Sequence, residues 1–219
     1  MKRLLAAVFL LLLAMPPGYA DGGGWVVKQD EGGIQVRQQK TGSPHETTNG
    51  VVEVEATLDA LAAVLKDISA CPRWVHGCVE GRLVKTLSPA ERITYTVVDA
   101  PFPLENRDMY IDSVIRYNRR TSTLTITLTG KENYAPAAPG RTRVLGLRGS
   151  WVFQQASPGN VRVSYQIQLD PQAPFNGSSN DHLVESVFNT LKNLRDVAKE
   201  PQYRNARFSE EEIRQIEVE

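Results

Sequence analysis

Short segments in which apolar and polar residues alternate open the chain beyond residue 24. Trp25–Gln29 and Ile34–Gln38 alternate in this way, and the acidic and glycine residues at 30–33 between them are typical of a tight turn. A third alternating segment, Thr48–Ala56, places valines on one side and glutamates on the other. These segments predict a β-hairpin followed by a third strand.

The pattern becomes helical at Leu58–Ile68, where apolar residues recur every three or four positions. Thr57 is suited to cap the start of this helix, and the Cys71-Pro72 pair is expected to stop it. Beyond residue 78 the pattern is again that of strands, rich in Thr, Val, Ile and Tyr and divided by turn-forming residues. The further predicted strands are Val79–Leu87, Ile93–Val98, Arg107–Tyr117, Thr123–Gly130, Thr142–Phe153 and Val161–Leu169.

The last long amphipathic segment is Asn180–Lys199, whose apolar residues form one broad stripe of a helix. The predicted strands need cover for one face, and this helix is the only long element available to cover it. The sequence therefore predicts an α+β, helix-grip fold, with a curved antiparallel sheet of about nine strands wrapped around a long C-terminal helix. An apolar space is expected wherever sheet and helix do not touch.

A polar segment, 201–219, follows this helix. Within it Ser209 and Glu212 have the spacing of a capping box, which predicts a short final helix. We expect this C-terminal tail to be solvated and dispensable.

The first 20 residues have the three-part layout of a secretory signal peptide. Two basic residues precede an apolar run of twelve residues, Leu4–Met15, and Gly18 and Ala20 suit a signal peptidase. At ~1.5 Å per residue this run spans only ~18 Å of a ~30 Å hydrocarbon core, although an uncleaved membrane anchor is the alternative. The sequence predicts a signal peptide at 1–20, one domain at 21–200, and export to a bacterial periplasm, with secretion elsewhere as the alternative.

Charge and composition narrow the functional classes. The 219 residues carry 25 basic and 25 acidic side chains, so the chain lacks the basic surplus of proteins that bind nucleic acid. We find no nucleophile motif and no metal-ligand cluster with paired spacing, and we predict no cofactor and no catalytic residue. The acid–base candidates are Asp99, Asp108, Asp112 and Tyr95, and nothing in their context marks them out.

The two cysteines, Cys71 and Cys78, are most simply a local disulfide in an exported protein. Closing so short a loop contributes ~2.5 kcal/mol on the chain-entropy model. Two alternatives use His76 between them. One is a metal site of the three residues, and the other is a thiol nucleophile with His76 as its base.

Several short pieces of sequence stand in a distinctive order between residues 25 and 199. They are Trp25 with Asp30-x-x-Gly33-Ile34, Leu58 to Asp67 with Trp74, Asn106-Arg107-Asp108, Arg143-Val144 with Gly149-Ser150-Trp151, Leu169-Asp170-Pro171 and Leu194-Arg195. In this order and spacing the chain resembles the START domain family (steroidogenic-acute-regulatory-related lipid transfer). The resemblance implies a helix-grip fold with one internal lipid cavity, gated by a loop and the last helix.

The loop at 99–105 places Phe102 and Leu104 among prolines, where neither can belong to a regular strand ladder. The loop either packs on the core or forms a stiff lid that touches a membrane, as the corresponding loop of the family is understood to do. Phe175, just ahead of the helix, has the same two interpretations. The expected cavity and gate residues are Phe102, Leu104, Arg107, Asp108, Tyr110, Phe175, Leu183, Val187 and Leu191.

Arg107 and Asp108 match an Arg-Asp pair of the family at the start of a strand. Adjacent strand residues point to opposite faces, so the two cannot both enter the cavity. Either they tie the strand end to neighbouring backbone, or one of them contacts a lipid head group. In some sterol-binding relatives a basic residue lies six positions beyond this Arg, whereas here that position is Ser113. The departure favours a phospholipid over a sterol.

The resulting prediction is non-enzymatic binding and transfer of one hydrophobic ligand, a phospholipid being favoured. We expect transient contact with a membrane surface, no nucleic-acid partner and a monomer. Two alternatives remain at this point. The first is a cavity enzyme of the cyclase or hydrolase type, which related helix-grip folds also host. The second is a lipid sensor or adaptor that presents a changed surface to a protein partner.

Overall fold

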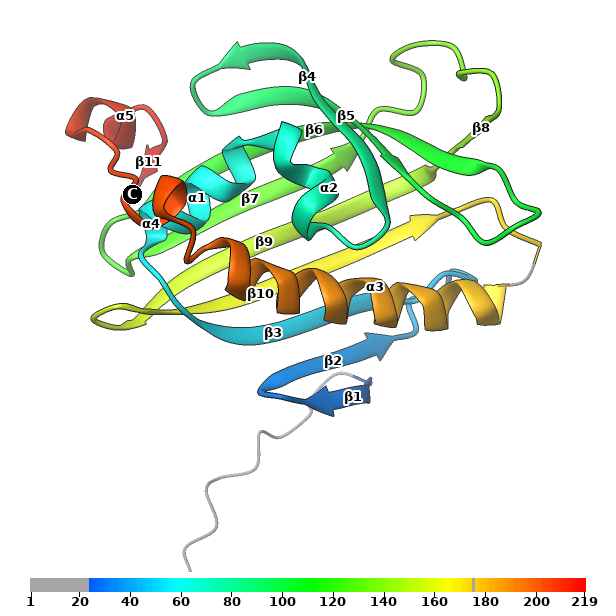
Figure 1. Ribbon diagram of the computed structural model, residues 1–219, viewed down its shortest axis with the longest axis horizontal. Coiled ribbons are helices and arrows are strands. Elements are labelled where there is room, and N and C mark those ends of the chain that lie inside the picture. The colour runs from blue at the N-terminus through cyan, green and yellow to red at the C-terminus, as the bar shows by residue number, and fades with distance from the viewer. Residues whose placement is uncertain (1–23, 175) are drawn as a thin grey trace, which may run out of the picture.

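The computed structural model describes residues 24–174 and 176–219, so the expected signal peptide and Phe175 lie outside the described residues. Within the described residues, nine strands form one curved antiparallel sheet in the order β1-β2-β3-β10-β9-β7-β6-β5-β4 (Figure 1). The predicted sheet is therefore confirmed. The strands are β1 (Trp25–Glu31), β2 (Ile34–Gln39), β3 (Thr47–Glu55), β4 (Cys78–Ser88), β5 (Glu91–Val98), β6 (Asn106–Asn118), β7 (Thr123–Gly130), β9 (Leu145–Ser157) and β10 (Asn160–Asp170).

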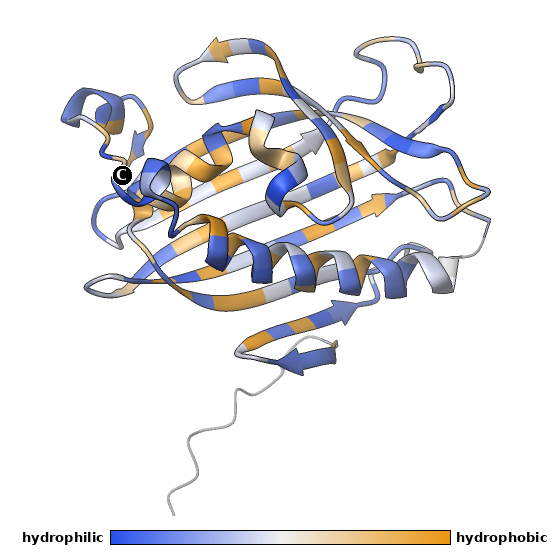
Figure 2. Ribbon diagram, in the orientation of Figure 1, coloured by the Kyte–Doolittle hydropathy of each residue, from blue (hydrophilic) through white to orange (hydrophobic). Residues whose placement is uncertain are grey.

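The long C-terminal helix α3 (Asn176–Val197) crosses one face of this sheet, as predicted, and begins four residues earlier than the pattern indicated. Two shorter helices, α1 (Leu58–Lys66) and α2 (Cys71–Trp74), lie over the same face (Figure 1). Thr57 caps α1 by accepting a hydrogen bond from the Ala60 amide at 3.1 Å. Bands of hydrophobic and hydrophilic residues alternate along the strands in Figure 2, as expected for a sheet with one buried face.

The Cys71-Pro72 pair does not end helical structure. A 3₁₀ turn at Ile68–Ala70 follows α1, and α2 then begins at Cys71 with its proline in the first turn. A proline costs nothing there because the first amides of a helix have no intrahelical partner. The expectation of a stop at Cys71 is therefore wrong.

The single strand predicted at 142–153 is divided in two. The short strand β8 (Arg141–Arg143) pairs in parallel with β6 at Asn106–Asp108, and β9 begins at Leu145. Along the same edge of β6, β7 pairs only from Ile111 onward. The strand β8 therefore pairs with the part of this edge that β7 leaves unpaired.

The C-terminal segment is mostly exposed, as predicted, but it also makes specific contacts with the domain. Tyr203 of α4 (Pro201–Arg204) is buried, and its hydroxyl donates to the Asp67 carboxylate at 2.7 Å. The predicted capping box of α5 (Glu210–Arg214) is formed by Ser209 and Glu212. The strand β11 (Glu217–Val218) then pairs in parallel with β6. The polar composition of 201–219 gave no indication that this segment contains a buried tyrosine and a strand that pairs with the sheet.

The contact between α3 and β3 is very close at Gly50. A Cβ atom at this position would lie 2.5 Å from Cδ1 of Leu191 and 2.6 Å from Cγ1 of Val187. Leu191 and Leu194 are completely buried here. Only glycine allows the helix to lie this near to the strand.

No helix among the described residues combines the length and the apolar character needed to span a bilayer.

We expect Gly50→Ala to lower the free energy of unfolding by about 1–3 kcal/mol, because the added methyl group overlaps two buried side chains. Urea unfolding followed by circular dichroism measures this change. Gly177→Ala is the matched control, because a Cβ there meets no atom within 4 Å and the residue lies in the first turn of α3. Equal stability of the two variants would contradict the close contact.

Candidate functional site

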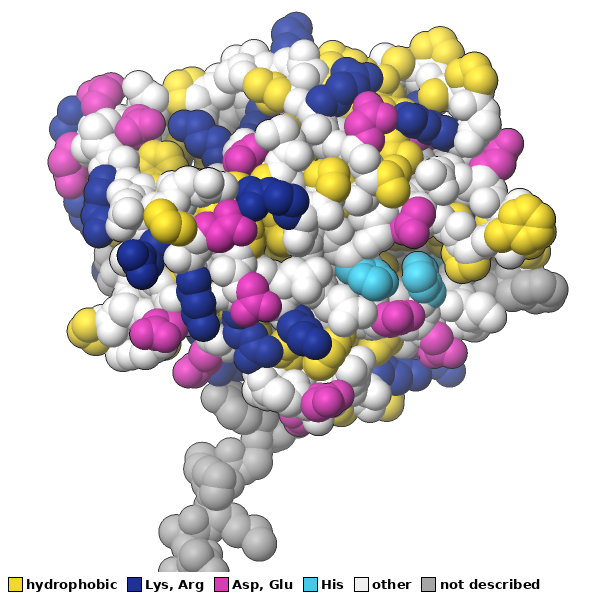
Figure 3. All heavy atoms as spheres, in the orientation of Figure 1, with side chains coloured by type: hydrophobic (Ala, Val, Ile, Leu, Met, Phe, Trp, Pro, Cys, Tyr) yellow, Lys and Arg dark blue, Asp and Glu magenta, His cyan; other side chains and the backbone are white. Residues whose placement is uncertain are grey.

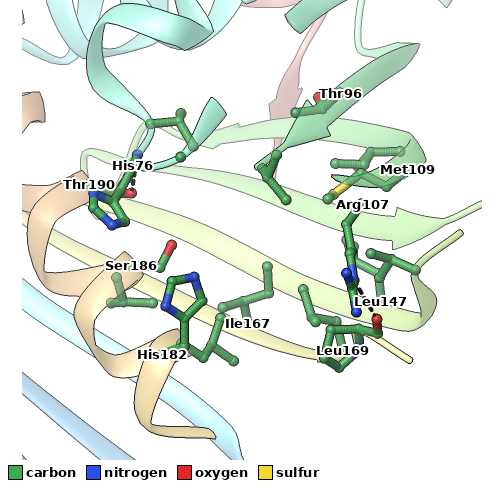
Figure 4. Close-up of a pocket in the computed structure, with 18 of the residues that line it drawn as sticks. His76, Thr96, Arg107, Met109, Leu147, Ile167, Leu169, His182, Ser186 and Thr190 are labelled. Atoms are coloured by element: carbon green, nitrogen blue, oxygen red, sulfur yellow. Dashed lines mark hydrogen bonds between the residues drawn. The ribbon is translucent and has the colours of Figure 1, made fainter. Parts of the chain in front are cut away.

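A cavity of about 340 Å³ lies between the concave face of the sheet and the helices (Figure 4). Its sheet wall is built from alternate residues of neighbouring strands, which share one face because strand side chains alternate. Cross-strand pairs such as Thr96 with Met109 and Trp151 with Tyr165 place these residues side by side. The apolar residues of this wall are Met109, Ile111, Ile126, Leu128, Leu147, Trp151, Tyr165, Ile167 and Leu169.

The opposite wall comes from α3 and from the segment that joins α2 to β4. Leu183, Ser186 and Val187 of α3 line the cavity, as do Trp74 and His76. Two hydrogen bonds fasten the segment to the helix. The His76 amide donates to Thr190 Oγ1 at 3.1 Å, and Asn193 Nδ2 donates to the Trp74 carbonyl at 3.1 Å.

The disulfide between Cys71 and Cys78 closes this segment into a ring, as predicted. Its sulfur atoms are bonded to each other, so neither a metal site nor a thiol nucleophile can use them. Cys71 itself lines the cavity. The disulfide therefore constrains the wall that carries Trp74 and His76, and on the chain-entropy model it contributes about 2.5 kcal/mol of stability.

Three aromatic rings of the cavity lining pack against one another. Trp151 lies parallel to Tyr165 with ring centroids 3.9 Å apart, and Trp74 meets Trp151 edge-on at 5.9 Å. Burial raises the pKa of the Tyr165 hydroxyl, so this group remains protonated and neutral at physiological pH. The three rings supply a broad apolar surface without a charged group.

The mouth of the cavity is bordered by loops and carries polar groups from Asp99, the two histidines and the first turns of α3. The segments at 99–104 and 171–174 line it, together with the first turns of α3. His76 and His182 face each other there, with ring centroids 6.4 Å apart (Figure 4). Figure 3 shows a pair of adjacent histidine side chains on this face of the molecule. An apolar interior with a polar rim suits an amphipathic ligand.

Arg107 joins the two loops of the mouth. Its Nε donates to the Pro171 carbonyl at 2.8 Å, Nη1 donates to the Glu105 carbonyl, and Nη2 lies 3.5 Å from the Gln172 carbonyl (Figure 4). The side chain is 5% exposed and lines the cavity. Arg107 thus ties the strand end to neighbouring backbone and also faces the cavity.

Asp108 and Tyr110 do not line the cavity, contrary to expectation. Both point to the opposite face of β6, because they are one and three residues from Arg107. Asp108 is completely buried and pairs with Arg143 at 2.7 Å. Tyr110 packs between the rings of Tyr95 and Tyr134.

The remaining predicted residues divide into three groups. Leu104, Leu183 and Val187 line the cavity. Leu191 lies in the closed core against Gly50 and does not reach the cavity, because the helix touches the sheet at that turn. Phe102 is 97% exposed and points away from the protein, and Phe175 lies outside the described residues.

Sequence patterns missed several residues of the site. Arg92, Thr94 and Thr96 line the cavity from β5, and simple alternation with Val98 could have found them. His76 and His182 are 106 residues apart in the chain and carried no signal that they would meet. Of the four acid–base candidates, only Asp99 borders the cavity, where it is exposed at the mouth.

The pKa of the Asp108 carboxyl reflects its pairing. Burial alone raises this pKa, but hydrogen bonds from Arg143 and Tyr95 and the charges of Arg143 and Arg141 outweigh burial and hold it below its usual value. Asp108 therefore stays ionised and serves the structure of the outer face of the sheet.

Comparison with known proteins places this geometry among lipid-binding folds. The model of the START domain family matches residues 15–196. An uncharacterized protein of Pseudomonas aeruginosa is 30% identical over 201 residues, which are 91% of this chain and 96% of that protein. The crystal structure of a STAR-related lipid transfer protein from Xanthomonas axonopodis is 27% identical with a TM-score of 0.75, covering 81% of this chain and 99% of that one.

A human structure shares the fold at lower identity. Human StAR-related lipid transfer protein 5 has a TM-score of 0.74 at 16% identity, over 82% of this chain and 88% of that one. This similarity concerns the fold alone.

We expect Asp108→Asn to lower the free energy of unfolding by about 3–5 kcal/mol at neutral pH, because it leaves Arg143 buried without its partner. The folded-state pKa of Asp108 is lowered, so its contribution is complete above the unfolded pKa of about 3.9 and is lost as pH falls through the folded value. Denaturant titration at several pH values should show the two proteins converging in acid.

Arg214→Gln is the control for this prediction, because its ion pair with Glu211 is exposed to solvent and contributes little to stability. A stability difference between wild type and Asp108→Asn that does not depend on pH would contradict the role given to the ionised carboxylate.

Proposed function

The chain belongs to the START domain family, and from this we propose that the protein binds one amphipathic lipid in its cavity and carries it between membranes. The START domain is a lipid-binding domain, and the structural relative from Xanthomonas axonopodis is described as a lipid transfer protein. The observation that carries the proposal is the apolar cavity with a polar mouth.

The energetic argument concerns the acyl chain. Each methylene moved from bilayer to water costs ~0.8 kcal/mol, so a sixteen-carbon chain costs on the order of 12 kcal/mol unless it is covered. The residues from β6, β7, β9 and β10 offer such a cover. A cavity of 340 Å³ is near the lower end of the ~300–1,000 Å³ of small-molecule sites, so one ligand is bound at a time. A two-chain lipid requires the loops of the mouth to move outward.

A phospholipid is favoured over a sterol by the charges of the lining. Arg92 and Arg107 line the cavity, whereas the acidic residue of the lining, Asp99, is exposed at the mouth. Buried cations are stabilised by an anionic group, which a phospholipid carries and a sterol lacks. The hydroxyl of Ser113 stands where some sterol-binding relatives have a basic residue.

We assign the gate to the loop at 99–106. It is held mainly by Arg107, by a hydrogen bond from the Ala100 amide to Asn106 and by one from Thr142 to Glu105. By contrast, α3 is fastened at its start to Gln38 and Glu46 and later to β3 at Gly50. A segment with few contacts opens at lower free-energy cost, so the loop moves while the helix serves as a wall.

Contact with a membrane is assigned to the tip of the same loop. Phe102 is 97% exposed and flanked by prolines, which limit the entropy lost when the ring inserts. An aromatic ring at this position partitions into the lipid interface.

The protein is proposed to act without catalysis, as an exported, periplasmic monomer. The acid–base candidates Asp108, Asp112 and Tyr95 lie on the outer face of the sheet, away from the cavity. A disulfide is typical of an oxidising compartment, which supports export and removal of residues 1–20. The domain then comprises residues 21–200 with the C-terminal segment 201–219 packed against it.

Ser186→Phe is expected to abolish lipid transfer, because the ring enters the cavity from α3 and takes the space of the acyl chain. Transfer of a fluorescent phosphatidylglycerol between vesicles of phosphatidylcholine measures the effect. Asp181→Phe adds the same ring to an exposed position of the same helix and should retain transfer. Undiminished transfer by Ser186→Phe would contradict the cavity as the binding site.

Phe102→Asp should slow transfer at least about tenfold while leaving the amount of bound lipid unchanged, because it removes the membrane contact and not the cavity wall. Val26→Asp is the matched control, since Val26 is 58% exposed on the edge strand β1, far along the sheet from the gate loop. Equal slowing of both variants would assign the effect to general surface charge rather than to the loop.

A further inference from the structure

A second cation, Arg92, lines the cavity at the end opposite its mouth and is partly buried. Arg92 lies near the start of β5, whereas Val98 at the other end of the strand pairs with Arg107 beside the gate. Six residues of extended strand separate Arg92 from Val98 by ~20 Å. Both residues line the same cavity.

Arg92 has hydrogen-bond partners but no acidic one. Its Nη1 donates to the Lys66 carbonyl at 2.7 Å and Nη2 donates to the Leu65 carbonyl, both at the end of α1. No carboxylate of the described residues forms an ion pair with it. Burial lowers the pKa of this guanidinium, and no neighbouring acid opposes the shift. The remaining N–H groups of the Arg92 guanidinium, including that of Nε, form no hydrogen bond within the described residues.

Hydroxyl groups without partners surround this end of the cavity. Ser113 pairs with Arg92 across the two strands, and Thr94 and Thr96 follow Arg92 along the inward face of β5. These three residues are 8%, 3% and 6% exposed, and within the described part of the chain none of their hydroxyls makes a hydrogen bond. Buried hydroxyls normally have partners, so a polar atom of a ligand is the natural one here.

Arg107, the other arginine of the lining, differs from Arg92 in its hydrogen bonds and in its neighbours. All three nitrogen atoms of the Arg107 guanidinium face backbone carbonyls, and its neighbours toward the cavity, Val98 and Met109, are apolar. Arg107 is thus occupied in holding the loops of the mouth together, with three of its five N–H donors bonded to carbonyls. Arg92 has only two of its five donors bonded, and it alone of the two lies beside unpaired hydroxyls.

We propose that Arg92 and Ser113 form an anion-binding subsite at the inner end of the cavity, which takes the phosphate or carboxylate of a lipid that enters head first. The acyl chain then lies along the aromatic wall toward the mouth. This inference rests on the proposed lipid-binding function and adds the class of ligand and its orientation. A carboxylate or phosphate offers a guanidinium an opposite charge and two acceptor oxygens for parallel hydrogen bonds, whereas a neutral carbonyl offers neither, and this difference sets the selectivity.

The test compares three ligands with the same acyl chain. Oleate carries a carboxylate, oleoyl lysophosphatidate carries a phosphate, and monoolein is neutral. Each is titrated against the purified protein with a neutral naphthylamine dye bound, at about pH 8, where both acids are ionised. We expect at least one acid to displace the dye about tenfold more tightly than monoolein, and the acid that does so identifies the group that the subsite takes.

Two variants isolate the subsite. Arg92→Gln should bring the affinity for the preferred acid down to that for monoolein while the affinity for monoolein itself is retained. Ser113→Ala, which leaves the bonds of Arg92 to α1 in place, should reduce the preference severalfold. Arg116→Gln removes the same charge from an exposed position of β6 and should keep the wild-type preference.

The outcomes separate this inference from the function on which it rests. Equal affinity of wild type for all three ligands overturns the anion subsite and leaves lipid binding intact. Failure of all three to displace the dye overturns lipid binding as well. A wild-type preference that survives in both Arg92→Gln and Ser113→Ala places the anion elsewhere and overturns the subsite.

Discussion

The cavity exists because α3 covers only part of the width of the sheet, packing on β2 and β3. At Gly50 the helix approaches β3 so closely that Leu191 and Val187 occupy the space of a side chain. At its start the helix is held to β2 by the hydrogen bond from Gln38 to the Asn180 carbonyl. Leu183 and Ser186 lie on another side of the helix and line the cavity together with residues of β5, β6, β7, β9 and β10. The other features of the site follow from this arrangement.

The charges within the protein divide according to the two faces of the sheet. On the outer face Asp108 and Arg143 form a buried pair that neutralises itself. On the inner face Arg92 and Arg107 rely on backbone carbonyls. Buried cations without acids are costly in a structural role alone, and an anionic ligand lowers that cost. The inner face of the sheet is therefore suited to bind an acidic ligand, whereas the charges of the outer face neutralise each other.

Local patterns predicted the architecture because the spacing of apolar residues within each strand and helix reflects which of its faces is buried. Alternation correctly separated Arg107 from Asp108, and the capping box at Ser209 could be identified from two residues. The same patterns could not distinguish Leu183 from Leu191, because both lie on one apolar stripe and only the distance between helix and sheet decides which lines the cavity. Nor could they predict that Tyr203 is buried against Asp67, because that contact joins segments 136 residues apart.

The proposed function requires that one lipid occupies the space between α3 and the sheet. Native mass spectrometry of the protein purified from its own organism, with organic extraction of the same sample, tests this claim most directly. The account predicts a complex one lipid heavier than the polypeptide, and an acidic amphiphile in the extract. A bare polypeptide mass together with an extract free of lipid would contradict it.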